Sequence, residues 1–204
     1  MSNTEKKFAE IISVLLHPVL MPLAGFLIIM YSGTYVGGME ADVKNFLIII
    51  ISGLTIVLPL IFIPLYLYIK LIRNVTMTNR RDRVVPFYIT LVFYLIAFLL
   101  LRNLPLNNLY NNFMVGTCLT LLLIIIFSLF WKISIHMAGL GGIVALILYL
   151  SFRLDTDLML YLVIAIFLSG AAAYARLATG AHTPLQVCAG FTLGLVTIAS
   201  SLTV

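Results

Sequence analysis

Charged residues occur in blocks along the chain and leave long apolar stretches between them. All 19 Asp, Glu, Lys and Arg residues lie outside seven uncharged stretches of 16 to 24 residues. The stretches are 11–31, 46–69, 84–101, 113–131, 137–152, 158–175 and 183–204. An α-helix needs about 20 apolar residues to cross the ~30 Å hydrocarbon core of a membrane. Because hydrocarbon offers no partners to backbone polar groups, each stretch is predicted to be a transmembrane helix.

Two features interrupt this regular pattern. The 137–152 stretch is the shortest and starts with a glycine-rich run, so it is either a full span or a re-entrant segment. The prediction is therefore a bundle of six to seven transmembrane helices. His17 lies inside the first stretch and is followed by Pro18. Since proline leaves a backbone acceptor without its N–H donor, we expect a neutral His17 bonded to freed backbone.

Composition supports the same fold class and excludes several others. The chain is 63% hydrophobic and 9% charged, with a mean hydropathy of +1.17, whereas a soluble domain is about 25% charged. Two cysteines inside apolar runs, Cys118 and Cys188, exclude a disulfide scaffold. The net charge of +5 comes from few basic residues in short loops, which favours lipid phosphates over nucleic acid as partners. We predict an all-α integral membrane protein forming one helical domain over residues 1–204.

Helix parity gathers the candidate chemistry on one membrane face. With seven spans, the loops 70–83, 132–136 and 176–182 open on the same side, and they carry two of the three histidines and most arginines. The loops on the other side carry mainly acidic residues and asparagines. Arginine presents a planar fork of donors that matches phosphate oxygens. The near absence of carboxylates on the basic side disfavours Mg²⁺ or Ca²⁺, and two histidines are too few for zinc. The pattern thus indicates metal-free and cofactor-free attack on a phosphate by one histidine, with the other as acid.

Three motifs on this face resemble a known family. The segment Arg176–His182 followed by Gln186 resembles the third motif of the type 2 phosphatidic acid phosphatase superfamily: Ser-Arg, five residues, His, three residues, Asp. Ile133-Ser134-Ile135-His136 resembles its second motif, Pro-Ser-Gly-His. The stretch from Arg73 to Pro86 resembles a degenerate first motif, either through Arg73 and Arg80 or through Arg80, Arg83 and Pro86. The resemblance covers about residues 70–190.

The resemblance implies a membrane-embedded helical bundle that removes phosphate from a lipid phosphate or diphosphate of the phospholipid, prenyl or lipid A type. By position, His182 is the nucleophile that forms a phosphohistidine, and His136 is the general acid. Gln186 occupies the position of the residue that orients the nucleophile. The phosphate-binding residues implied in the same way are Arg176, Arg80, Arg73, Arg83 and Ser134.

The departures from the family pattern leave a second hypothesis open. Gln186 stands where the family has Asp, and Ile135 stands where it has Gly. If Thr183 caps the last helix and Pro184 starts it, the Gln186 amide oxygen lies about one turn from His182 and can accept its Nδ1 proton. An amide does not stabilise an imidazolium as a carboxylate does. The alternative is a weak or inactive relative that binds lipid phosphate or a membrane partner.

Two further interpretations compete with parts of this hypothesis. The Arg73–Arg83 cluster is also typical of basic residues that touch anionic headgroups. A transporter with a basic vestibule is disfavoured, because no span contains a charged residue. The orientation in the membrane is a separate question. The motif face carries nine Lys and Arg and the other face three, which places the motifs in the cytoplasm, whereas bacterial members of the family usually face the periplasm. The expected location is a bacterial inner membrane, with the orientation and the oligomeric state left open.

Overall fold

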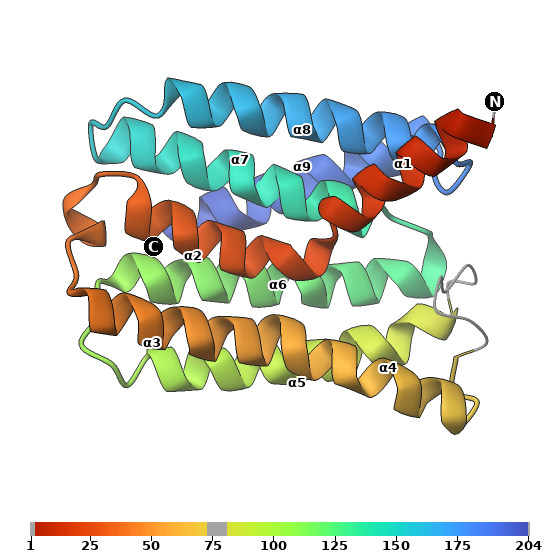
Figure 1. Cartoon of the computed structure of the whole chain (residues 1–204), viewed down its shortest axis with the longest axis horizontal. Helices are drawn as coiled ribbons and strands as arrows, with labels where there is room; N and C mark the ends of the chain where they lie inside the picture. Colours follow the sequence, from red (N-terminus) through yellow and green to blue (C-terminus); the bar gives the residue numbers. More distant parts are fainter. Residues whose placement is uncertain (1–2, 73–80, 204) are drawn as a thin grey trace.

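All regular secondary structure in the described part of the chain is helical. The structure is a computed structural model and describes residues 3–72 and 81–203. Its α-helices, which run roughly side by side in Figure 1, are α1 (Asn3–Leu15), α2 (Met21–Tyr31), α3 (Ala41–Ser52), α4 (Leu58–Tyr68), α5 (Arg81–Leu101), α6 (Asn108–Phe130), α7 (Ile135–Arg153), α8 (Met159–Ala178) and α9 (Pro184–Leu202). Three short helical pieces join them: η1 (Pro18–Leu20), η2 (Tyr35–Gly37) and the π-helical turn η3 (Gly53–Val57).

Within residues 3–72 and 81–203 the helices form seven segments long and apolar enough to cross a membrane. They are Thr4–Tyr31, Ala41–Tyr68, Asp82–Leu101, Asn108–Phe130, Ile135–Arg153, Met159–Ala178 and Pro184–Leu202. The prediction of an all-helical membrane bundle is confirmed. The short glycine-rich stretch is an uninterrupted helix of 19 residues with most of its length buried inside the protein, which favours seven spans over six.

The prediction of one continuous helix over the first stretch is wrong. α1 ends at Leu15, and the chain continues through η1 before α2 begins. Pro18 has no N–H to donate, and a residue before proline avoids the helical region, so His17 is extended at φ −63° and ψ 133°. The Val19 N–H donates to His17 Nδ1 at 3.3 Å. His17 therefore bonds to backbone beside the proline, but it accepts from an N–H, whereas the expectation was that it donates to a carbonyl freed by the proline.

A second irregularity lies in the second stretch, which contains Pro59 and Pro64. The π-helical turn η3 separates α3 from α4 and directly precedes Pro59 near the start of α4. Proline cannot donate the usual i→i−4 hydrogen bond, and such turns relieve the mismatch. The buried Thr55 hydroxyl donates to the Ile51 carbonyl at 2.7 Å within this turn.

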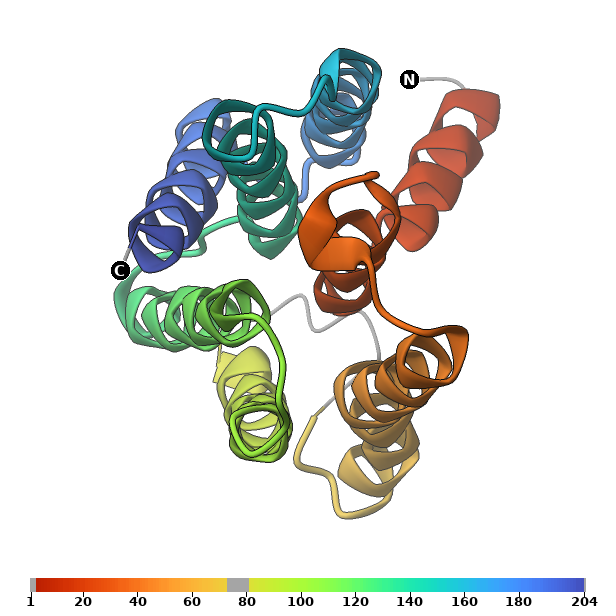
Figure 2. The same ribbon diagram turned by 90° about the vertical axis from the view of Figure 1, so that its left-hand side faces the viewer.

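α7 lies at the centre of the half of the bundle that carries the motifs. It contacts α2, α6, α8 and α9, and Figure 2 shows α9 on one side of it and α8 and α2 on the other. Its contact with α9 is a backbone-to-backbone seam: a Cβ on Gly190 or Gly194 would collide with the carbonyl oxygen of Ser134 or Ala138. Small residues of this kind let membrane helices approach closely. The seam holds the start of α9 beside the start of α7.

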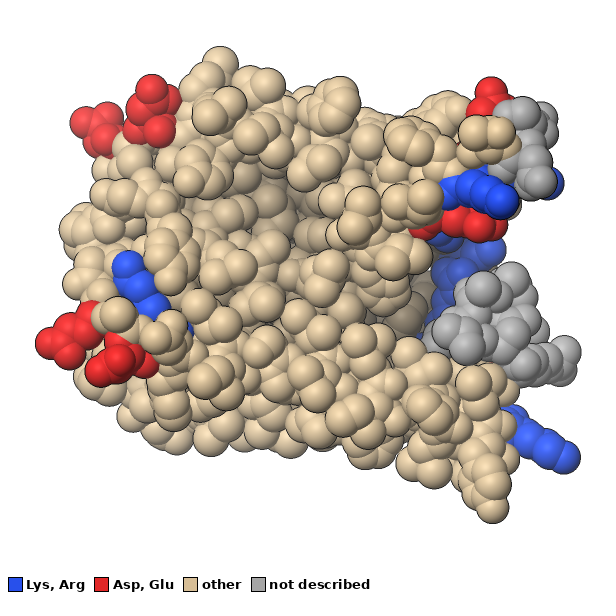
Figure 3. All heavy atoms as spheres, in the orientation of Figure 1, with Lys and Arg blue, Asp and Glu red and all other residues tan. Residues whose placement is uncertain are grey.

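The predicted gathering of the motif loops at one end is present in the structure. The α6–α7 and α8–α9 connections and the start of α5 lie at the right-hand end in Figure 1, where α1 also lies. Figure 3 shows Lys and Arg side chains gathered at that end, while the opposite end carries mainly Asp and Glu. The two membrane faces therefore differ in charge as the sequence indicated.

Candidate functional site

The end of α8 places His182 above Arg176. α8 stops at Ala178, and Gly180 adopts a φ of +65°, a left-handed conformation that glycine tolerates and that commonly ends helices. The N–H groups of Ala181 and His182 then donate to the Arg176 carbonyl at 3.1 and 3.3 Å. The chain thus folds back over the last turn of α8, and this turn brings the two motif residues together.

The imidazole of His182 is held through one nitrogen. Its Nδ1 lies 3.2 Å from Gln186 Oε1 and 3.3 Å from the Lys132 carbonyl oxygen. Both atoms are acceptors, so Nδ1 carries the proton and Nε2 carries a lone pair. The contact expected between His182 and Gln186 is present.

The start of α9 fixes Gln186 in turn. Thr183 caps the helix and Pro184 lies in its first turn, as expected. The Gln186 N–H donates to Thr183 Oγ1 at 3.4 Å, and the Thr183 N–H donates to Gln186 Oε1 at 3.1 Å, which completes a capping box. One amide oxygen therefore serves both the helix cap and the histidine.

Burial and three cations keep His182 neutral. The side chain is 6% exposed. Burial first, and then the charges of Arg176, Arg83 and Lys132, lower the pKa of His182 to about 4, although the Gln186 hydrogen bond acts in the opposite direction. The pKa of Lys132 is itself lowered by burial and by Arg83 and Arg176. At neutral pH the imidazole is therefore an uncharged base among positive charges.

The second histidine faces the N-terminal helix. His136 lies in the first turn of α7 and is 9% exposed. Its Nε2 donates to the Ser13 carbonyl oxygen of α1 at 3.1 Å. Its Nδ1 is buried without a hydrogen-bond partner. The ring makes an edge contact with that of His17, with centroids 5.6 Å apart.

Ser134 and Arg176 complete the same site. Ser134 is fully buried and its N–H donates to the Gln186 carbonyl at 3.3 Å. Although it is the N-cap residue of α7, its hydroxyl makes no capping bond and has no partner. Arg176 Nη1 donates to Ser13 Oγ at 3.3 Å, and its Nε is buried without a partner.

Buried polar atoms without partners are concentrated here. Native interiors leave few such atoms, so each is informative. In residues 3–72 and 81–203, four buried side-chain atoms lack a partner: Asn111 Oδ1, Ser134 Oγ, His136 Nδ1 and Arg176 Nε. Three of the four belong to this site, and two of them are donors. The donor set and the surrounding cations suit a ligand that presents anionic oxygens.

The structure brings together most of the residues predicted for the site. His182, His136, Gln186, Ser134 and Arg176 converge between α7, α8 and α9. Arg83, in the first turn of α5, is half-buried and near enough to affect the pKa values of His182 and Lys132. Arg73 and Arg80 lie outside the described residues. Of the two ways to match the first motif, the one through Arg80, Arg83 and Pro86 has residues that the structure describes, and the one through Arg73 and Arg80 has none.

Sequence reasoning missed two contributors to the site. Lys132 lies in the predicted motif loop 132–136 but was given no role, although its place four residues before His136 was a usable signal. Ser13 lies inside an apolar stretch, and no pattern distinguished it. Its contacts exist only because α1 crosses this end of the bundle. Within the described ranges, no group of three or more His, Cys, Asp or Glu side chains is placed to hold a metal ion.

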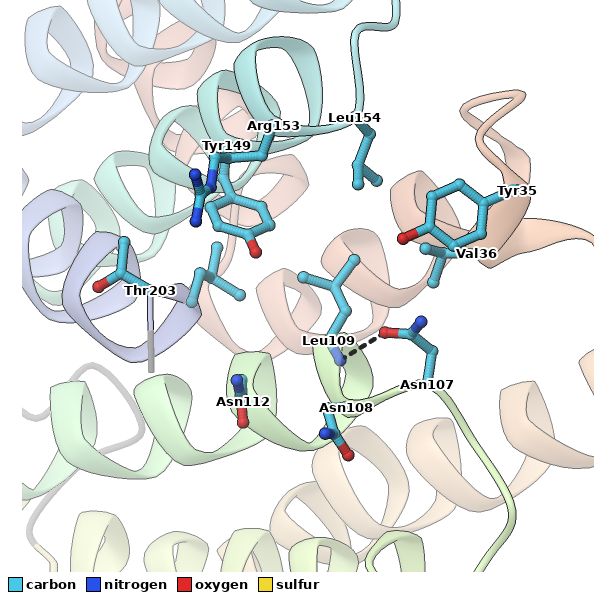
Figure 4. A pocket seen from close by; sticks show the side chains of 11 residues that line it. Tyr35, Val36, Asn107, Asn108, Leu109, Asn112, Tyr149, Arg153, Leu154 and Thr203 are labelled. Carbon is cyan, nitrogen blue, oxygen red and sulfur yellow. Dashed lines mark hydrogen bonds between the residues drawn. The ribbon is translucent and has the colours of Figure 1, made fainter.

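A separate cavity lies at the opposite end of the bundle. Its volume is about 270 Å³, and Figure 4 shows the side chains that line it. It is lined by Tyr35, Val36, Asn107, Asn108, Leu109, Asn112, Tyr149, Arg153, Leu154, Leu202 and Thr203. Asn107 Oδ1 accepts from the Leu109 N–H at 2.9 Å and caps α6. The lining contains no histidine and one cation, so it lacks the nucleophile and the charge found at the motif end.

Comparison with known proteins adds no relative from which a role could be transferred. No family model matches the chain, and neither a curated protein nor a solved structure matches it. The likeness to type 2 phosphatidic acid phosphatases therefore rests on the motif residues themselves. The function is argued from the geometry of the site.

Proposed function

We propose that this membrane protein is a metal-independent lipid phosphatase. It hydrolyses a phosphomonoester or diphosphate of a phospholipid, prenyl or lipid A type lipid, through a phosphohistidine on His182. One observation carries the proposal: the neutral imidazole of His182 is held by Nδ1, has a lone pair on Nε2, and is surrounded by three cations. An uncharged base that is held in place among positive charges is suited to attack an anionic phosphate.

The reaction proceeds in two balanced steps. His182 Nε2 attacks phosphorus, the bond from phosphorus to the lipid oxygen breaks, and its electron pair leaves on that oxygen. A protonated His136 supplies the proton that makes the lipid alcohol. Water then attacks the phosphohistidine, the phosphorus–nitrogen bond breaks, and its electron pair returns to His182 Nε2. The water proton passes to His136, and inorganic phosphate leaves.

The surrounding charges stabilise the transition state of both steps. Negative charge spreads over the equatorial oxygens as phosphorus becomes pentacovalent, and fixed donors lower the energy of that state. Arg176, Arg83 and Lys132 supply positive charge around His182. The buried Ser134 hydroxyl and the Arg176 Nε–H have no partner within the described protein and suit the phosphate oxygens.

Gln186 supports a second candidate function. Its amide oxygen selects the His182 tautomer but carries no negative charge to stabilise an imidazolium. Ile135 adds a side chain where the family motif has glycine. These two positions favour, as the alternative, a weak or inactive protein that binds a lipid phosphate or a membrane partner without turnover.

Phosphate release in lipid nanodiscs tests the proposal. The substrates are phosphatidic acid and a long-chain prenyl diphosphate, each assayed with and without EDTA. We expect release that survives EDTA, is abolished in His182→Ala, and is unchanged in the matched control Thr203→Ala at the opposite end. Loss of turnover on chelation with recovery in Mg²⁺ contradicts metal independence. Binding of either lipid without release by the wild type supports the inactive alternative.

A further inference from the structure

The N-terminal helix α1 closes over the candidate site through one residue. The Ser13 carbonyl oxygen accepts from His136 Nε2 at 3.1 Å, and the Ser13 hydroxyl accepts from Arg176 Nη1 at 3.3 Å. The partners come from α7 and α8, more than 120 positions away in the chain. Ser13 therefore bridges the proposed acid and a proposed phosphate-binding residue.

Both oxygens of Ser13 act as acceptors, which is the role that substrate oxygens have at these two groups. In the proposed reaction His136 donates to the lipid oxygen that leaves, and Arg176 donates to a phosphate oxygen. A donor hydrogen directed at Ser13 is not directed at substrate. In this arrangement α1 and a lipid phosphate compete for the same two donors.

α1 is weakly attached to the rest of the bundle. It packs mainly on α8, and of its described side chains Ala9 alone is fully buried. Its outward face carries Phe8, Ile11, Val14 and Leu15, which are 56 to 69% exposed. An element with few buried contacts opens at low free-energy cost.

The connection to α2 is suited to a hinge. The last i→i−4 bond runs from the Leu16 N–H to the Ile12 carbonyl, the His17 N–H donates to the Val14 carbonyl at 3.2 Å, and His17 is extended before Pro18. A few residues at the end of an element commonly absorb the dihedral changes of such a movement. α1 can therefore turn without unwinding α2.

We propose that α1 is a displaceable lid, and that Ser13 occupies the positions of substrate oxygens while the lid is closed. The inference rests on the proposed phosphatase function for the identity of the competitor, but the closed contact itself does not. A closed lid lowers the apparent affinity for substrate by the fraction of molecules that are open. Weakening the Ser13 contacts lowers KM, and strengthening them raises it.

Three substitutions at Ser13 test the direction of this effect in the full chain. Ser13→Ala removes the Arg176 acceptor and should lower KM for phosphatidic acid about two- to tenfold, the worth of one hydrogen bond. Ser13→Asp places a carboxylate beside Arg176 and should raise KM about tenfold or more. Ser13→Asn is nearly isosteric with Ser13→Asp but uncharged, so its KM should fall between those of wild type and Ser13→Asp. If Ser13 instead positions Arg176 for catalysis, Ala lowers kcat, and that result overturns the lid.

A spin label on α1 gives a readout that does not depend on turnover. The label is placed at Lys7→Cys, an exposed position, in a Cys188→Ala background that removes the exposed native thiol. We expect higher mobility in nanodiscs containing phosphatidic acid than in phosphatidylcholine alone, a further increase in Ser13→Ala, and restricted motion in Ser13→Asp. A label that responds in this way while no phosphate is released supports the lid and contradicts the phosphatase. Turnover with a label unaffected by lipid and by all three variants contradicts the lid and leaves the phosphatase standing.

Discussion

The orientation of His182 depends on groups from separate parts of the chain. Gln186 lies one turn away on α9, whereas the Lys132 carbonyl comes from the α6–α7 connection, 50 residues distant. Two acceptors at Nδ1 leave one tautomer available. The same loop also brings the Lys132 charge close to the ring. His182 is therefore prepared as a base by one loop and one helix start acting together.

We expect the acidic limb of the pH–rate profile to lie at an unusually low pH. The active form of His182 is the neutral imidazole, so kcat/KM rises as pH increases through the pKa of this residue, and it falls again where His136 loses the proton that it donates. Since burial and then the neighbouring cations lower that pKa to about 4, the limb should lie near pH 4 rather than near 6.5. Lys132→Gln removes one cation and should move the limb upward, while Lys132→Arg keeps the charge and should not. NMR titration of His182 checks the same pKa directly, and a wild-type value near 6.5 contradicts the account.

Substitutions at Gln186 separate enzyme from inactive relative. Gln186→Asp or Gln186→Glu supplies a carboxylate, which should raise the His182 pKa, move the acidic limb upward and increase kcat above it by less than ~10⁴-fold. The increase in kcat should be larger for Gln186→Glu than for Gln186→Asp, because Glu has the same side-chain length as Gln, whose Oε1 lies 3.2 Å from His182 Nδ1. The kcat of Gln186→Leu should be lower than that of the wild type, since the leucine side chain offers no acceptor for the Nδ1 proton of His182. Equal activity of Leu and wild type in the phosphate-release assay would show that Gln186 only packs.

At the level of elements, the seam between α7 and α9 determines whether the two histidines lie at the same end of the bundle. Its glycines allow each backbone to contact the other helix directly, at Ser134, Ala138 and Phe191. The seam ends at the N-termini of both helices, where His136 and His182 lie. Helix packing and site geometry are therefore coupled.

Gly194→Ala should disturb both stability and activity. The added Cβ collides with the Ala138 carbonyl, which is backbone and cannot rotate away, so α9 must shift at a cost of about 1–3 kcal/mol. We expect a lower Tm and a larger loss of kcat than the stability change alone produces. Gly170→Ala on α8 is the matched control, because its Cβ meets nothing within 4 Å. Thermal unfolding and phosphate release of the two variants provide the comparison, and equal behaviour refutes the coupling.

For the whole molecule, the distribution of charge is the main indicator of orientation. In the topology predicted from the sequence, the motif side holds nine of the twelve Lys and Arg residues, and positive charge near spans favours the cytoplasm. Figure 3 shows the same asymmetry in space. The charges thus predict a cytoplasmic site if the protein resides in a bacterial inner membrane.

Labelling of single cysteines in intact cells checks the orientation. In the Cys188→Ala background, an impermeant maleimide should label Glu40→Cys, at the end away from the motifs, without permeabilisation. Lys7→Cys, at the motif end, should react only after the membrane is opened. The reverse pattern places the site in the periplasm and shows that the site arginines, rather than topology, explain the charge bias.

Much of the molecule follows from local pattern. The absence of charge over seven stretches determines the spans, because lipid excludes both charges and unpaired backbone groups. Parity then assigns His136, His182 and Arg176 to one end. The capping box follows from Thr183 and Gln186 three residues apart at a helix start, so the His182–Gln186 contact was predictable from local spacing.

Other features arise only when distant segments pack. Ser13 meets His136 and Arg176 across 123 and 163 positions, and no periodicity or spacing in the chain encodes that meeting. The Lys132 carbonyl and the neutral state of His182 depend in the same way on the close approach of α7 and α9. Hydrophobicity and chain direction act locally, so the order of residues is enough to place them at one membrane face. Tertiary packing alone decided which of them touch and that α1 covers them, because those contacts depend on helix positions that many segments set together.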